Sequence, residues 1–487
     1  MCKAVLYSTT LLFATALGYL VDRSLEPKAH GRDVVETVVH RIQRARVFSD
    51  DKDFFRRVAY TESKFGEDPE TYRDGYYGGI WQFDRLAATQ KDDPHYAPDR
   101  LNIIHQGIKR EWGIDWKQVT NEDLLKPFYS GLAFAVYVEL TSPSRAPIPD
   151  TVKGQDGYWK DWYNTNYKGK YGDFETRVQE LLEEDMRAEG GKIDMMVVVD
   201  GSFRVGFDAF ASVRDSVARL VSAFDLKEAH IGMVTYSSEV TRRIPLMNSF
   251  PMAKLQERIL GMPYPRGAAN PHTGIMRAVR EFQSLPEARK RGGVPRLLLV
   301  FTSGQYDLGD DPAEAAKFAA ESDIKTCAFG VGLSINMKEV HAIANNDPDF
   351  FFMTKFNEAL KEQIARVVRR MKSVPQTPMV GSEMTETMKR ASEKRYYRVR
   401  VPENGLTIHL INEKGATRGF WAYTPASEQP SSALFDGVLA AGATFIPPPR
   451  TRAPSRDVTI VLESSEPDSF VRMKIVAGAT TKAPAVN

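Results

Sequence analysis

The chain of 487 residues has very little cysteine, with only Cys2 and Cys327. Two cysteines exclude a disulfide-stapled scaffold and a cysteine-based zinc finger. A surplus of one charge is also lacking, since 65 Lys and Arg residues oppose 63 Asp and Glu residues. This balance argues against a nucleic-acid partner, because phosphate binding draws on a cationic excess. The length and the 42% hydrophobic content instead indicate two or three domains with buried apolar cores.

Long apolar runs are absent except at the start of the chain, where residues 4–21 carry no charge. The small-x-small pattern of Ala14–Ala16 is typical of a signal-peptidase site. We therefore expect a signal peptide over residues 1–18 and a secreted, extracellular protein. The alternative is a signal anchor, in which residues 4–21 hold the protein in a membrane, although hydroxyl side chains weaken the run.

The pattern of the chain then changes from domain to domain. Residues 30–187 show the apolar spacing of amphipathic helices, which predicts an all-α domain. Residues 190–372 alternate short apolar runs with helical spacing, which predicts a doubly wound α/β domain with a mostly parallel sheet. A linker over residues 373–392 is expected to precede an antiparallel β-sandwich over residues 393–478, and residues 479–487 to form a tail.

The first apolar run of the middle domain leads into a polar loop. Met195–Val199 is followed by Asp-Gly-Ser-Phe-Arg at Asp200–Arg204, and the next two runs lead into Ile231–Ser237 and Leu299–Gly304. In doubly wound sheets ligands bind at the carboxyl ends of the strands. These three segments, in this order, closely resemble the von Willebrand factor A domain over about 180 residues. The resemblance implies a Rossmann-like fold that recognises a protein ligand.

The resemblance also implies a metal-ion-dependent adhesion site. The family binds a divalent cation through an Asp-x-Ser-x-Ser loop, a Thr on a second loop and an Asp on a third. Asp200 and Ser202 match the first two ligands, but Arg204 replaces the second Ser and Ser303 stands where the family has Asp. The second loop has Ala or Pro, at Ala269 or Pro271, where the Thr is expected.

The remaining ligand set is poor for a hard cation, which requires several oxygens with carboxylate charge. We expect the guanidinium of Arg204 to pair with Asp200 and fill the vacancy. The metal site is therefore predicted to be degenerate and the protein to need no cofactor. In the alternative, a divalent cation binds and Asp307 or Asp310 supplies a missing ligand.

A second motif lies in the helical region. Glu62-Ser63 ends a predicted helix, and Gly79-Ile80-Trp81-Gln82 follows about twenty residues later. This spacing resembles the lysozyme-like superfamily, in particular goose-type lysozymes and lytic transglycosylases. Further on, Tyr163-Asn164-Thr165 resembles a variant of the Tyr-Asn-Ala-Gly motif of these proteins. The resemblance spans about 130 residues and implies a glycan site.

Within that resemblance Glu62 is the catalytic general acid. A glycosidic oxygen requires a protonated acid near neutral pH, and both a helix C-terminus and an apolar wall such as Trp81 raise the pKa of a carboxyl group. Asp74 is predicted to be the second catalytic carboxylate; without one, the sugar's own group takes its place, as in a transglycosylase. The residues predicted to bind substrate are Ser63, Trp81, Gln82, Tyr163 and Asn164.

Two functions follow. The first is a secreted glycoside hydrolase or lytic transglycosylase that acts on a glycan polymer, either peptidoglycan or a chitin-like chain, and whose middle domain recognises a protein. The alternative is a non-catalytic recognition protein that combines a degenerate adhesion site with a sugar-binding pseudo-lysozyme domain.

Overall fold

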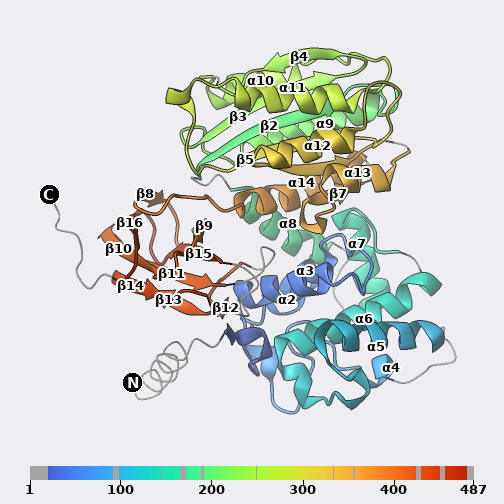
Figure 1. Cartoon of the computed structure of the whole chain (residues 1–487). Helices are drawn as coiled ribbons and strands as arrows, with labels where there is room; N and C mark the ends of the chain where they lie inside the picture. Colours follow the sequence, from blue (N-terminus) through green and yellow to red (C-terminus); the bar gives the residue numbers. More distant parts are fainter. Residues whose placement is uncertain are drawn as a thin grey trace. The chain divides into compact units, whose positions relative to one another are not determined.

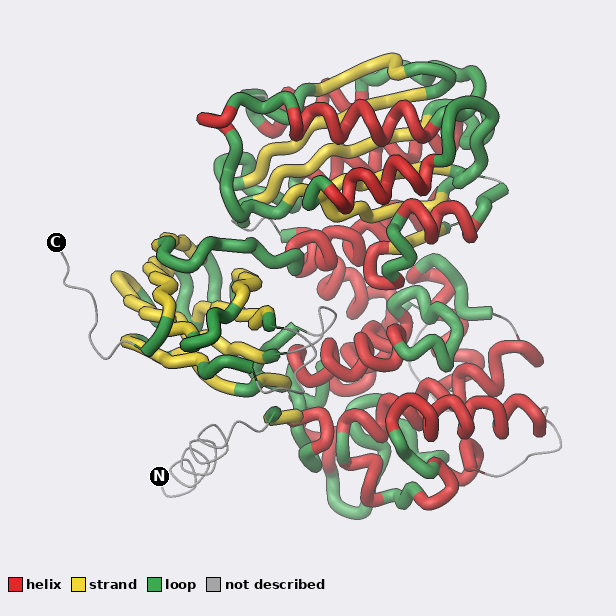
Figure 2. Tube along the Cα trace, viewed as in Figure 1, coloured by secondary structure: helices red, strands yellow, loops and turns green. Residues whose placement is uncertain are grey.

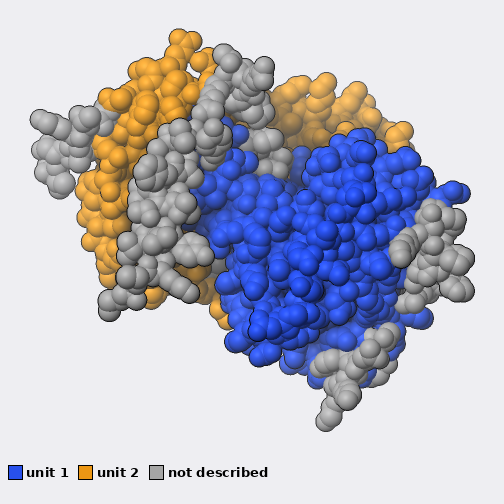
Figure 3. Space-filling view, turned by 90° about the horizontal axis from the view of Figure 1, so that it is seen from below, with its two compact units in different colours: residues 1–181, 420–438 blue, residues 182–419, 439–487 orange. Residues whose placement is uncertain are grey.

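The computed structural model describes residues 20–90, 98–145, 147–164, 172–187, 191–247, 249–332, 334–354, 357–423, 429–449 and 456–479. The chain divides into two compact units, coloured blue and orange in Figure 3. The first comprises residues 1–181 and 420–438, and the second comprises residues 182–419 and 439–487. The predicted signal segment and residues 480–487 of the predicted tail lie outside the described residues.

The first unit is built mainly from helices (Figure 2). The helices in this part of the chain are α2 (Arg32–Arg44), α3 (Phe54–Ser63), α4 (Ala87–Gln90), α5 (Pro98–Trp112), α6 (Pro127–Arg145), α7 (Val152–Tyr158) and α8 (Asp173–Met186). Helix α6 is apolar around most of its circumference, which is typical of a central helix. Its Phe134 ring contacts the rings of Phe54, Phe55, Trp81 and Tyr163.

This unit also contains a small antiparallel sheet that the helical pattern did not predict. Strand β1 (Val21–Asp22) pairs with β12 (Leu434–Phe435). Two-residue strands are too short to produce an alternating pattern, so the sequence carries no readable signal for them. The segment that contains β12 comes from the C-terminal part of the chain but folds with the helices.

The second unit contains a six-stranded sheet in the order β4-β3-β2-β5-β6-β7, with helices on both faces (Figure 1). The strands are β2 (Ile193–Asp200), β3 (Ala229–Tyr236), β4 (Val240–Ile244), β5 (Arg296–Thr302), β6 (Ile324–Gly330) and β7 (Phe351–Met353), and only β4 is antiparallel. The helices are α9 (Phe207–Val221), α10 (Met252–Leu260), α11 (Pro271–Gln283), α12 (Pro312–Glu321), α13 (Met337–Ile343) and α14 (Asn357–Lys372). The predicted α/β domain with a mostly parallel sheet is confirmed.

Two apolar cores hold this sheet between its helices. One core packs α9, α10 and α14 against the sheet, and the other packs α11, α12 and α13. Every residue of β2 is buried. A strand covered on both faces shows a continuous apolar run without alternation, which is why these strands could be predicted from the sequence.

The C-terminal region forms two four-stranded sheets, in the orders β14-β10-β16-β8 and β13-β11-β15-β9. The strands are β8 (Glu383–Met388), β9 (Lys394–Arg400), β10 (Leu406–Lys414), β11 (Thr417–Ala422), β13 (Gly437–Leu439), β14 (Gly442–Ile446), β15 (Asp457–Ser464) and β16 (Ser469–Ala477). Buried and less buried residues alternate along β9 and β16, as in strands with one face on a core.

The predicted linker over residues 373–392 contains ordered structure. Strand β8 lies within it, and Gln376 forms an isolated bridge with Tyr397 of β9. The Thr377 amide donates a hydrogen bond to the Gly293 carbonyl at 2.7 Å. The sequence of β8, Glu-Met-Thr-Glu-Thr-Met, has few apolar residues, so the pattern did not predict a strand. Among the described residues, no helix is long and apolar enough to cross a bilayer.

Candidate functional site

Glu62 lies in the last turn of α3, just before a sharp reversal of the chain. Lys64 and Phe65 have positive φ angles of 49° and 62°, and Gly66 follows at 85°. Consecutive left-handed residues are costly for side chains other than glycine, and such backbone strain clusters at functional sites.

Ser63 joins this helix end to the loop that carries Trp81 and Gln82. Its buried hydroxyl donates to the Ile80 carbonyl at 2.7 Å and accepts from the Gly66 amide at 2.9 Å. The Ser of the Glu-Ser pair therefore holds the two motifs together. Ser63 is buried, so it positions the loop and does not make the predicted substrate contact.

The carboxylate of Glu62 accepts two hydrogen bonds on one oxygen. Oε1 accepts from the indole Nε1–H of Trp159 at 2.7 Å and from Asn164 Nδ2 at 3.3 Å. Burial raises the pKa of Glu62 to about 7, against the lowering effect of these two donors and of the Arg177 charge. Near neutral pH the carboxyl group is thus partly protonated and can donate a proton.

Trp81 has an exposed fraction of 0%. Its indole nitrogen donates to the Phe55 carbonyl at 2.9 Å, and its ring stacks on Phe134. A ring without exposed surface cannot stack on a sugar. Trp81 is therefore a core residue in this structure and does not make the predicted substrate contact.

Gln82 is held by the protein itself. Its amide nitrogen donates to the Gly79 carbonyl at 2.7 Å and to the Thr71 carbonyl at 3.1 Å, and its amide oxygen accepts from Arg73 at 2.8 Å. The hydroxyl of Tyr163 donates to the Trp81 carbonyl at 2.5 Å. Of the residues predicted to bind substrate, Asn164 is the one with a hydrogen bond to Glu62.

Asp74 lies exposed in the loop after α3, and within the described residues it has no interaction with Glu62. Burial raises the pKa of Tyr76 and of Tyr163, and the charges of Asp84 and Glu62 act on both tyrosines in the same direction. Asp84 lies two residues after Gln82, so the sequence alone predicts that it is close to the Gly-Ile-Trp-Gln motif.

Trp159 was missed as a partner of Glu62. Its contact joins residues 97 positions apart, and no local pattern reports such a pairing.

The second candidate site lies at the carboxyl end of β2. Asp200 is 1% exposed, and its oxygens accept from the Ser202 amide at 2.9 Å and from the Thr302 hydroxyl at 3.3 Å. Burial raises the pKa of Asp200 to about 6, while hydrogen bonds from Ser202, Tyr236 and Thr302 oppose the shift. Gly274 makes room for the Tyr236 ring, because a Cβ there would lie 2.4 Å from Tyr236 Cδ1.

The predicted pairing of Arg204 with Asp200 is wrong. The Arg204 guanidinium instead pairs with Asp307, with Nε 3.1 Å from Oδ1, and donates to Gln305 at 3.2 Å. Asp200 lies buried, where hydroxyl and amide groups already satisfy it, whereas the Arg204 side chain extends over the exposed loops.

Asp307 and Asp310 are the two residues expected to supply a missing metal ligand in the alternative reading. Asp307 is held by Arg204 and also accepts from the Ala269 amide at 2.9 Å. Asp310 lies exposed on the same loop. Within the described residues no three His, Cys, Asp or Glu side chains are grouped so that they could hold a metal ion. One buried carboxylate with a neighbouring guanidinium does not fit the requirements of a divalent cation.

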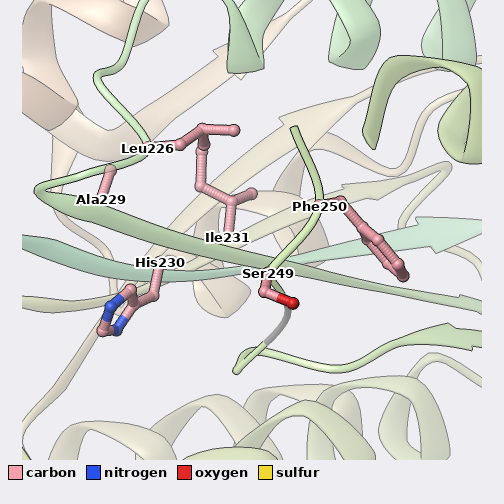
Figure 4. Close-up of a pocket in the computed structure, with 6 residues that line it drawn as sticks. All are labelled: Leu226, Ala229, His230, Ile231, Ser249 and Phe250. Atoms are coloured by element: carbon pink, nitrogen blue, oxygen red, sulfur yellow. The ribbon is translucent and has the colours of Figure 1, made fainter. Parts of the chain in front are cut away.

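A small pocket of about 140 Å³ lies near the opposite, amino-terminal end of β3 (Figure 4). Its lining includes His230 and Ser249, whose side chains do not point toward each other. Nδ1 of His230 lies 3.0 Å from Asp194 Oδ1, and burial and the Arg291 charge lower the pKa of the imidazole. The arrangement therefore gives no Ser-His nucleophile.

Comparisons with known proteins identify the class of the middle domain. Residues 194–367 match the sequence model of the von Willebrand factor type A domain, so this part of the chain is a domain of that class. Among individual proteins, matrilin-4 of Mus musculus is 30% identical over 190 residues, which cover 37% of this chain and 30% of matrilin-4. The collagen alpha-1(XXI) chain of Homo sapiens is 27% identical over 203 residues, which cover 38% of this chain and 21% of that protein.

One solved structure that matches is proximal thread matrix protein 1 from the mussel byssus. The match has a TM-score of 0.34 at 19% sequence identity. It covers 41% of this chain and 50% of the mussel protein's chain. The chain spans less than a third of the length of the matrilins and collagens that it matches.

Proposed function

We propose that the chain is a secreted recognition protein whose von Willebrand factor type A domain binds a protein partner without a divalent cation. The observation that carries this proposal is the Arg204–Asp307 ion pair at the carboxyl end of the sheet. Arg204 stands where the resemblance expects a Ser, Ser303 stands where it expects the carboxylate of an Asp, and Asp307 is held by the arginine. The similarity to matrilins and collagens supports a recognition role, and the apolar N-terminal run supports secretion.

The loops around this ion pair offer a surface suited to a protein partner. Phe203, Phe207, Tyr306 and Leu308 are 57%, 60%, 43% and 46% exposed. Exposed aromatic side chains beside an arginine are typical of the residues that contribute most to binding at interfaces. Backbone hydrogen bonds join the loops, from the Phe203 amide to the Gly267 carbonyl and from the Asp307 amide to the Ala269 carbonyl. A surface held in advance loses less entropy on binding.

Calorimetric titration of the whole chain with Mg²⁺ and Mn²⁺ tests the absence of a cation. We expect no binding heat at millimolar metal. The triple variant Arg204→Ser, Ala269→Thr, Ser303→Asp restores the family's oxygen ligands and should bind Mg²⁺. Replacing the exposed Arg242 of β4 with Ser, as a matched loss of one positive charge, should not create binding. Tight binding of either metal by the wild type would overturn the proposal.

As a second function, we propose that the helical unit binds or cleaves an amino-sugar glycan, either peptidoglycan or a chitin-like polymer, with Glu62 as the proton donor. The carboxyl group of Glu62 is half-buried, has a pKa near 7 and lies at a strained helix end, which supports this role. Asp84, and not Asp74, is the better candidate for a second carboxylate, because its charge reaches the same tyrosines as Glu62.

Purified peptidoglycan and chitin oligomers test the second function. We expect Glu62→Gln to abolish cleavage but not binding, because glutamine keeps the shape and the Oε1 acceptor but cannot donate the acidic proton. Glu67→Gln, an exposed change on the following turn, should leave cleavage intact. Anhydro-sugar products would indicate a transglycosylase, and reducing ends a hydrolase. If the wild type and Glu62→Gln bind equally and neither cleaves, the domain is a binding module.

A further inference from the structure

The segment that approaches Glu62 has an unusual backbone. After α7 the chain forms one π-helical turn, η5 (Trp159–Tyr163), in which the Asn164 amide donates to the Trp159 carbonyl at 2.7 Å. Such turns are rare and occur mostly at functional sites. In an α-helix, side chains five positions apart point roughly 140° away from each other. The wider π turn instead allows Trp159 and Asn164 to reach the same atom.

That shared atom is Oε1 of Glu62, at 2.7 Å from the indole nitrogen and 3.3 Å from the amide nitrogen. Within the part of the chain that the structure describes, the other oxygen, Oε2, accepts no hydrogen bond. We infer that the π-helical turn is a two-donor clamp: it fixes Oε1 as the acceptor and leaves Oε2 as the oxygen that carries and delivers the proton. Trp159 and Asn164 are thus positioning residues, and their catalytic meaning rests on the proton-donor role proposed for Glu62.

The turn is itself held at several points. The Tyr163 hydroxyl donates to the Trp81 carbonyl at 2.5 Å, and Arg85 donates to the Tyr163 carbonyl at 2.9 Å. The ring of Trp159 packs against Phe174 of α8, with ring centroids 5.7 Å apart. These contacts fix both donors before any ligand binds, and such preorganisation is what a proton-donating site requires.

Other charged and titratable groups near the carboxyl group are few. Arg177 of α8 donates to the Thr61 carbonyl at 2.6 Å, and its charge favours the ionised form of Glu62. Tyr76 and Tyr163 interact with Glu62 electrostatically, and burial raises the pKa of both phenols, so they stay neutral near pH 7. The two donors of the turn are therefore the main polar contacts that can be removed without changing the local charge.

The test follows the Glu62 carboxyl carbon by ¹³C NMR across a pH titration of the whole chain, with Glu62→Gln to assign the signal. Trp159→Phe removes one donor but keeps a ring against Phe174. We expect the pKa of Glu62 to rise by about one pH unit, as for the loss of one hydrogen bond to a charged group. Asn164→Ala should raise it by less, since its hydrogen bond is longer.

Trp162→Phe is the matched control, because Trp162 lies in the same turn but gives no hydrogen bond to Glu62. It should leave the titration unchanged. An unchanged pKa in a folded Trp159→Phe chain would overturn the clamp, and if that variant does not fold, an unchanged pKa in Asn164→Ala would do so. Since the readout is a titration, a wild type that does not cleave glycan would refute the enzyme proposal and leave this test intact.

Discussion

At the scale of one residue, Asp200 shows what burial without a neighbouring positive side chain does to a carboxyl group. Its oxygens lie among the Ser202 amide and the Thr302 and Tyr236 hydroxyls, and no positive side chain pairs with it in the described part of the chain. Hydrogen bonds offset only part of the desolvation of the anion. The surroundings of Asp200 therefore favour its protonated form, whereas a bound cation would favour the ionised carboxylate.

This preference predicts a pH-dependent gain in stability for Asp200→Asn. The folded pKa, about 6, lies above the ordinary 3.8, so the unfolded chain ionises first. Below pH 3.8 Asp200 is protonated in both the folded and the unfolded chain, so it does not lower the free energy of unfolding. As pH rises to 6 the wild type loses stability, by at most about 3 kcal/mol, and the cost remains above pH 6.

Urea unfolding at pH 4 and pH 7 measures this difference. We expect Asp200→Asn to be more stable than the wild type at pH 7 and nearly equal to it at pH 4. Asp208→Asn, an exposed change in the first turn of α9, should follow the wild type at both values. If the stability of Asp200→Asn equals that of the wild type at both pH values, the buried Asp200 does not hold a proton at pH values where the unfolded chain has lost it.

At the scale of elements, the loop of residues 78–82 depends on a glycine for its path. Gly79 has a φ of 59°, and a Cβ there would lie 2.5 Å from the Leu124 carbonyl oxygen and 2.6 Å from Ser130 Oγ. The backbone must therefore pass directly against η4 (Glu122–Leu125) and α6. This close approach, together with the Ser63 hydrogen bond, positions the loop against the end of α3.

We predict that Gly79→Ala destabilises the chain by more than about 2 kcal/mol, because strain at positive φ adds to a backbone clash. Gly113→Ala separates the two causes, since Gly113 has a φ of 70° but no atom within 4 Å of the place that the alanine methyl group would take. It should cost only about 1 kcal/mol. Chemical denaturation compares the two, and equal losses would show that the clash at Gly79 is relieved by small shifts.

Some elements of the fold and of the candidate sites could be predicted from the sequence, and others could not. The strands of the α/β sheet were predictable because burial on both faces makes each one a continuous apolar run. The carboxyl-end loops followed from topology, so the position of Asp200 and Ser202 at the end of β2 was predictable. The partner of Arg204 was not, because the choice between Asp200 and Asp307 depends on which carboxylate is buried. Likewise the π turn at Trp159 follows from tertiary contacts and has no local signature.

At the scale of the whole molecule, residues 429–436 lie in the chain between β11 and β13 of the C-terminal sheets but fold with the helical unit. Asp33 at the start of α2 accepts from the amide and the hydroxyl of Ser432, at 3.1 Å and 2.7 Å. The Arg23 amide donates to the Ala433 carbonyl at 2.8 Å, next to the β1–β12 pair. Contacts between segments this far apart in sequence are opposed by the entropy of closing a long loop.

We therefore predict that Asp33→Ala loosens this segment without unfolding the helices. The variant loses both hydrogen bonds to Ser432, and the amides of residues 431–435 should exchange with solvent about tenfold faster, as for a loss of roughly 1.4 kcal/mol in local opening. Hydrogen exchange measured by mass spectrometry on the whole chain reports this region separately. Asp99→Ala removes an acidic residue from the first turn of another helix, α5, and so controls for the loss of helix-dipole stabilisation. If both variants accelerate exchange at residues 431–435 equally, or neither does, then Asp33 does not hold the segment through Ser432.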